Sequence, residues 1–96
     1  MAVLRHPGWT TVTVTVRYFA GAQAAAGTPE EGVTLTAPAT LGTLLADLVS
    51  RHGDGLARVL SAASFIVDEV AVTGAAREAT LDDGTCIDVL PPFAGG

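Results

Sequence analysis

The chain has 96 residues, a net charge of −5 and five arginines but no lysine, so it would repel a phosphate backbone and could hardly build its own ATP pocket. Its single cysteine excludes an internal disulfide and a multi-cysteine metal site, and no apolar run approaches the roughly 18 residues of a membrane span. The apolar segment at the start of the chain is too short for a secretory signal, which predicts a cytoplasmic protein. The hydrophobic content of 49% predicts that some apolar surface faces a partner.

The N-terminal part predicts a leader and two strands. Residues 1–9 are expected to form a loose leader, broken by Pro7-Gly8. Valine and threonine alternate through residues 10–18, which predicts a strand with its valines inward and its threonines outward. The Ala- and Gly-rich residues 19–32 suit a helical turn and a loop. Residues 33–36 then predict a short return strand.

A helix is predicted next, with consistent start and stop signals. Thr40 is the expected N-cap, and Gly53 is the expected C′ residue. Asp47 and Arg51 form an i,i+4 pair in the favourable order, and His52 lies where a cation suits the helix dipole. One apolar stripe runs along this helix: Leu41, Leu44, Leu45, Leu48 and Val49.

The C-terminal part predicts a short helical turn and three strands. The turn covers residues 56–60, and strands follow at residues 64–67 and 70–72, joined by Asp68-Glu69 without the glycine that a tight hairpin prefers. The triplet Asp82-Asp83-Gly84 predicts a turn into a last strand at residues 85–90.

This order of elements predicts an α+β domain. One main helix must cover one face of a mixed sheet and leave the other open, and the crossover through the helix makes the first and last strands parallel neighbours. That arrangement is the β-grasp, or ubiquitin-like, fold. We expect a leader at residues 1–9, a domain at residues 10–90 and a protruding tail at residues 91–96.

The tail is the candidate functional site. Pro91 and Pro92 restrict its base, and Gly95 and Gly96 lack side chains, so the end can enter a narrow pocket of another protein. The terminal carboxylate of Gly96 is the expected reactive group. Phe93 would either anchor the tail in a partner or pack on its own domain, and Ala94 completes the probe.

Four segments carry a family resemblance: residues 14–22, the helix from residue 40 to 48, the turn at residues 82–84 and the tail at residues 90–96. Together they resemble the small, sulfur-carrying subunit of molybdopterin synthase, over residues 10–96. The leader is extra relative to that family, and Thr85 stands where the family often has an acid. Neither departure touches the tail.

The resemblance implies a carrier that is not an enzyme on its own. An adenylating, E1-like enzyme would join the Gly96 carboxylate to AMP, and a sulfurtransferase donor would replace AMP to leave a thiocarboxylate. The large subunit would bind the pterin precursor in a heterotetramer with the carrier, with Pro91, Pro92, Phe93, Ala94 and Gly95 in its active site. The chain itself would bind no cofactor, metal, nucleic acid or membrane.

Three alternatives stay open at this point. The same chemistry would serve a sulfur carrier for cysteine or thiazole synthesis. A protein modifier would instead use the activated Gly96 to acylate lysines of other proteins. The plainest alternative is an interaction domain of the same fold whose Gly-Gly end is merely frayed.

Other candidate residues favour structural roles. Cys86 is expected to be a small buried hydrophobe rather than a sulfur carrier. His6 and His52 are far apart and lack neighbouring ligands, so no metal site is expected. Asp82-Asp83 is typical of turn chemistry rather than an acid-base pair, and Arg17 is expected on the open face of the sheet, facing either a partner or solvent.

Overall fold

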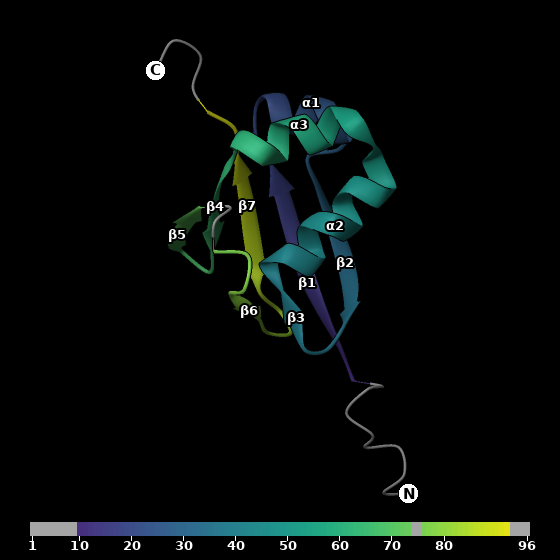
Figure 1. Ribbon diagram of the computed structural model, residues 1–96, viewed down its shortest axis with the longest axis vertical. Coiled ribbons are helices and arrows are strands. Elements are labelled where there is room, and N and C mark those ends of the chain that lie inside the picture. The colour runs from purple at the N-terminus through teal and green to yellow at the C-terminus, as the bar shows by residue number, and fades with distance from the viewer. Residues whose placement is uncertain (1–9, 74–75, 93–96) are drawn as a thin grey trace, which may run out of the picture.

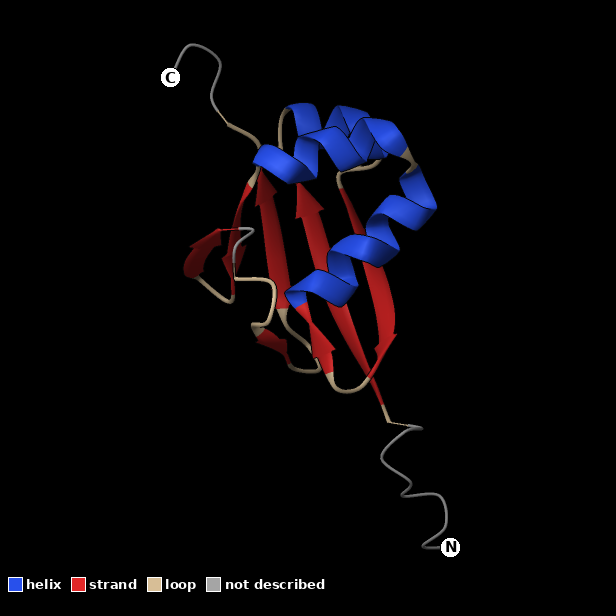
Figure 2. Ribbon diagram, in the orientation of Figure 1, coloured by secondary structure: helices blue, strands red, loops and turns tan. Residues whose placement is uncertain are grey.

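A five-stranded mixed sheet forms the frame of the molecule, and helices cover one of its faces (Figures 1 and 2). The computed structural model describes residues 10–73 and 76–92. The strand order is β2-β1-β7-β4-β5, and β3 and β6 form a separate two-stranded ribbon. In chain order the elements are β1 (Thr11–Tyr18), α1 (Gly21–Ala26), β2 (Glu30–Thr36), β3 (Ala39–Thr40), α2 (Leu41–His52), α3 (Asp54–Ala62), β4 (Ser64–Val67), β5 (Val70–Thr73), β6 (Thr80–Leu81) and β7 (Cys86–Leu90).

The first and last strands are parallel neighbours at the centre of the sheet. Thr15 is in register with Cys86, and Tyr18 is in register with Val89. Every other adjacent pair in this sheet is antiparallel. The predicted mixed sheet, with one covered and one open face, is therefore confirmed.

Alternating side chains of the strands build the core against the helices. Val12, Val14, Val16 and Tyr18 of β1 are buried, whereas Thr11 and Thr13 are exposed, as the alternation predicted. The apolar stripe of α2 packs onto this surface: Leu41, Leu44, Leu45 and Leu48 are buried, and Val49 lies at the edge.

The ends of α2 follow the sequence signals. The Thr40 hydroxyl accepts from the Thr43 amide, and the Thr43 hydroxyl accepts from the Thr40 amide, which closes a reciprocal capping box. Arg51 binds Asp47 at 2.7 Å, as expected for this spacing. Gly53 ends the helix with φ 87°, a conformation that favours glycine.

Several elements differ from their predicted extents. The helix α3 has nine residues rather than a single turn, and α1 has six. The strand β2 begins at Glu30 instead of Val33, because its backbone continues to pair with β1 up to Arg17. The ribbon of β3 and β6 was not predicted, since two-residue strands carry no detectable periodicity.

Both acidic turns form, and each also supports a neighbouring strand. Asp68 and Glu69 join β4 to β5, with φ angles of 47° and 73°. The Asp68 carboxylate accepts a hydrogen bond from the Cys86 amide at 3.0 Å. In the second turn Gly84 has φ 87°, and the Asp83 carboxylate accepts the Thr13 amide at 2.7 Å. The predicted turn role of the aspartates is confirmed. No helix among the described residues is long and apolar enough to cross a membrane.

Candidate functional site: the base of the C-terminal tail

The strand β7 carries the tail and is paired on both sides. It pairs in parallel with β1 from Cys86 to Val89. It pairs in antiparallel with β4 up to Leu90, which lies opposite Ser64. Prolines have no backbone N–H, so the ladder cannot continue through residues 91 and 92. The tail therefore begins at the end of the sheet, which lies beside α3 and opposite the N-terminal end of β1 (Figure 1).

The two prolines at the base of the tail lie within the described residues. Pro91 is half-buried and Pro92 is exposed. Phe93, Ala94, Gly95 and Gly96 lie outside the described residues. The predicted reactive carboxylate of Gly96 is therefore not placed, whereas the strand and the prolines that present it are.

An ion pair lies on the open face just before the tail base. Arg17 donates to both carboxylate oxygens of Asp88, at 2.6 and 2.9 Å, and its guanidinium carbon lies 6.0 Å from the centroid of the Phe19 ring. The hydrogen bond to Asp88 raises the pKa of Arg17 above its usual range. Arg17 was expected on this face, but its partner was not, because the pair depends on the parallel register of β1 and β7.

Cys86 does not lie in the core, so the expectation of a buried cysteine is wrong. Ile87 and Val89 face the helices, and the alternation of the strand turns Cys86 to the open face, where it is half-buried. A shallow hollow of about 210 Å³ beside it is lined mainly by charged groups, among them Arg17, Asp68 and Asp88. Burial raises the pKa of the thiol, which keeps it protonated at neutral pH.

A polar cluster joins the sheet to α2 on the covered face. The Glu31 carboxylate accepts the Tyr18 hydroxyl at 2.5 Å, contacts His52 Nε2 at 2.6 Å and pairs with Arg51 at 3.3 Å. Burial acts to raise the pKa of Glu31, but the hydrogen bonds of Tyr18 and His52 outweigh it, and the pKa lies below its ordinary value. His52 thus contacts a carboxylate as well as lying in the last turn of α2.

The described residues carry no group of three or more His, Cys, Asp or Glu side chains placed to hold a metal ion. Several of their charged groups instead form the ion pairs and turns described above. The arrangement can present the start of the C-terminal tail, Pro91 and Pro92, from a central strand that is paired on both sides.

The fold is that of the ubiquitin-like β-grasp proteins, in which helices pack on one face of a mixed sheet. Residues 16–96 match the model of the ThiS family. The chain therefore belongs to the ThiS family of ubiquitin-like sulfur carriers. No curated protein sequence is significantly similar to it.

Solved structures similar to the chain include archaeal and bacterial proteins. The Haloferax volcanii HVO 2177 protein is 30% identical, with a TM-score of 0.75 over 90% of this chain and 88% of that one. A Pyrococcus furiosus protein assigned to subunit 1 of molybdopterin converting factor is 25% identical, with a TM-score of 0.70 over 85% and 99%. A Helicobacter pylori complex of subunits 1 and 2 of that factor matches at 27% identity, with a TM-score of 0.61 over 88% and 100%.

Protein modifiers share the fold as well. The small archaeal modifier protein 1 of Haloferax volcanii is 24% identical, with a TM-score of 0.75 over 88% of this chain and 99% of that one. At this identity the likeness extends to the fold alone.

Proposed function

We propose that the chain is the sulfur carrier of a molybdopterin synthase, its small subunit. The observation that carries the proposal is the likeness, along nearly their whole length, to proteins described as subunit 1 of molybdopterin converting factor, one of them in complex with subunit 2. The tail base supports it, because the tail starts from a central strand that is paired on both sides, and two prolines follow that strand directly.

The proposed chemistry takes place at the carboxyl group of Gly96. The carboxylate attacks the α-phosphorus of ATP on an activating enzyme, pyrophosphate leaves, and an acyl-adenylate forms. A sulfide equivalent from a sulfurtransferase then attacks the acyl carbon, and the bond to AMP breaks with the electron pair leaving on AMP. The product is a thiocarboxylate, and the catalytic groups belong to the partners.

Sulfur transfer would occur in the active site of the large subunit. The thiocarboxylate sulfur attacks an electrophilic carbon of the pterin precursor, and the carbon–oxygen bond at that carbon breaks with the electron pair leaving on oxygen. Water then cleaves the bond between the acyl carbon and sulfur, which leaves the sulfur on the pterin and restores the carboxylate. A negatively charged carrier with few cations suits this division of labour, since binding of the nucleotide and of the pterin falls to its partners. We place this chemistry in the cytoplasm, with a heterotetramer as the working assembly.

Intact mass spectrometry tests the proposal. After incubation with an activating enzyme, ATP and a sulfur source, the intact chain should gain the mass difference between sulfur and oxygen, through the change at Gly96. A matched variant with one alanine appended after Gly96 should remain unmodified and keep its stability. ATP consumption without any sulfur gain would overturn the proposal.

Partner capture separates the pathways. A chain with a free C-terminus should bind a pterin-binding large subunit and stimulate dithiolene formation on the pterin precursor. Stable capture of a cysteine- or thiazole-forming enzyme instead, or Gly-Gly remnants on cellular lysines that depend on this chain, would refute the assignment to molybdopterin synthase.

A further inference from the structure

A hollow of about 400 Å³ opens between α2 and α3, on the face of the molecule opposite the open sheet face. Gly53 alone separates the two helices, so they diverge directly from it. Leu45 and Leu60 close the bottom of the hollow and are nearly fully buried. Ala46 and Ala57 line its walls, and their small side chains leave the space unfilled.

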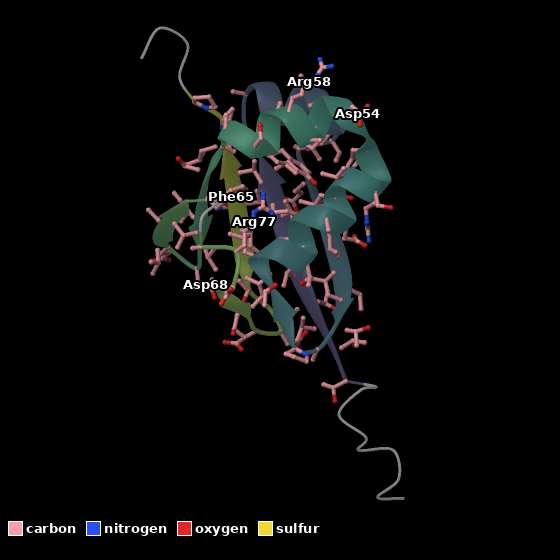
Figure 3. The ribbon with its side chains drawn as sticks, viewed as in Figure 1. Asp54, Arg58, Phe65, Asp68 and Arg77 are labelled. Carbon is pink, nitrogen blue, oxygen red and sulfur yellow. The ribbon has the colours of Figure 1, made fainter. Side chains whose placement is uncertain are left out.

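Arg77 is an exposed residue that lines this hollow, and Figure 3 shows where it lies relative to the helices. Its carbonyl oxygen accepts a hydrogen bond from the Gly42 amide at 2.8 Å. The Leu41 amide donates a hydrogen bond to the Ala79 carbonyl oxygen at 2.9 Å. A Cβ at position 42 would lie 3.2 Å from the Arg77 carbonyl oxygen. The loop that carries Arg77 is therefore held closely against the first turn of α2.

The guanidinium of Arg77 forms no ion pair with the described residues. Arg17 and Arg51, by contrast, both bind carboxylates. An apolar hollow with a cation in its lining suits a ligand that has an apolar side chain close to a carboxylate.

The chain contains such a ligand in its own tail. Phe93 is followed by Ala94, Gly95 and Gly96, so an aromatic ring precedes a terminal carboxylate by three residues. The tail also starts near the hollow: Leu90 is in register with Ser64, which follows α3 closely, and Ser61 of the last turn of α3 lines the hollow. Six residues from position 91 to 96 can span about 20 Å.

We propose that this hollow is a binding site for the chain's own C-terminal tail, with the Phe93 ring against its apolar floor and the Gly96 carboxylate at Arg77. Because the tail is tethered, its effective concentration at the hollow is on the order of millimolar, so even a weak contact is populated. A partner that takes up the tail must compete with this contact. Loss of the carboxylate charge on acylation would weaken it.

Methyl NMR of the full-length chain tests the site through ring-current shifts. Phe93→Ala should shift the methyl resonances of Leu45, Val49 and Leu60 and leave that of Ile66, on the open face, unchanged. Phe19→Ala is the matched control, because Phe19 is an exposed phenylalanine that does not line the hollow. The Phe93→Ala shifts should not depend on protein concentration.

The electrostatic contact is tested with a C-terminally amidated chain and with Arg77→Gln. Each change should move the same methyl resonances toward the positions that they have in Phe93→Ala. The equilibrium constant for docking of the tail should fall about threefold to fivefold, as expected for loss of an exposed ion pair. The combination of both changes should add little more. Arg58→Gln, a change at an exposed arginine of α3 that does not line the hollow, is the control and should have no effect.

Any one of four results would overturn the inference. The first is that Phe93→Ala shifts only methyl resonances of the open face, and the second is that it shifts none. The hollow resonances could change on dilution, which would mean that the tail of a second copy binds. They could respond to deletion of residues 1–9 and not to Phe93→Ala, in which case the leader is the occupant. Sulfur loading of Gly96 is measured separately, so failure here is distinct from failure of the proposed function.

Discussion

Removal of the Tyr18 hydroxyl tests the polar cluster that joins the sheet to α2. In Tyr18→Phe the ring remains in the core, and only the 2.5 Å hydrogen bond to Glu31 is lost. His52 and Arg51 still contact the carboxylate, so no polar group is left without a partner. The variant should therefore fold and differ from the wild type in one interaction.

The expected loss in free energy of unfolding is about 1.5 kcal/mol at pH 7, the low end for a hydrogen bond to a charged group. The loss should depend on pH, because the pKa of Glu31 is lowered in the folded chain from its ordinary value of 4.5. A lowered pKa stabilises the fold above the unfolded-state value, and this stabilisation disappears as pH falls through the folded-state value. The difference between variant and wild type should therefore shrink below about pH 4.5.

Urea denaturation at pH 7 and at pH 3 measures the effect for both chains. Thr13→Val is a matched control, since it also removes a hydroxyl from β1. Among the described residues, the Thr13 hydroxyl contacts only the Thr34 hydroxyl, at 3.1 Å, and no charged group. Its effect should be small and independent of pH. Equal destabilisation by Tyr18→Phe at both pH values would show that the hydroxyl does not bond the ionised carboxylate, and the reasoning would fail.

Three further predictions concern local features. Gly53→Ala should lower the unfolding free energy by about 1 to 2 kcal/mol because φ is 87° there, whereas Gly55→Ala, inside α3 with free space around it, should be neutral or stabilising in the same denaturation assay. Thr40→Ala should cost about 1 kcal/mol through loss of the N-cap, and Thr40→Ser should recover most of it; equal losses would exclude the capping contact. Cys86 should react with iodoacetamide more slowly at pH 7 than an unfolded chain does, and rapid labelling would contradict its raised pKa.

Local sequence signals predicted the elements that have strong periodicity or strong caps. The alternation before Tyr18 predicted β1, and the leucine stripe after Thr40 predicted α2. Gly53 marks the end of α2, so these predictions are confirmed. Cys86 was misplaced because the prediction rested on the usual burial of cysteine, whereas the alternation of Ile87 and Val89 with Asp88 puts Cys86 on the face opposite the core.

Contacts between distant residues could not be predicted in this way. The Arg17 to Asp88 pair joins residues 71 positions apart, and it forms only because β1 and β7 are parallel in one register. The Glu31 cluster likewise requires β2 to extend to Glu30, and no apolar alternation signals that extension. The tail was recognisable from its prolines and glycines, but the hollow between α2 and α3 depends on how these two helices pack.

The parallel pairing of β1 and β7 also sets the mechanical behaviour of the chain. The N-terminal end of β1 and the C-terminal end of β7 lie at opposite ends of the sheet (Figure 1). A pull on the tail against the N-terminus would therefore slide the two strands along each other and load their hydrogen bonds together, rather than one after another.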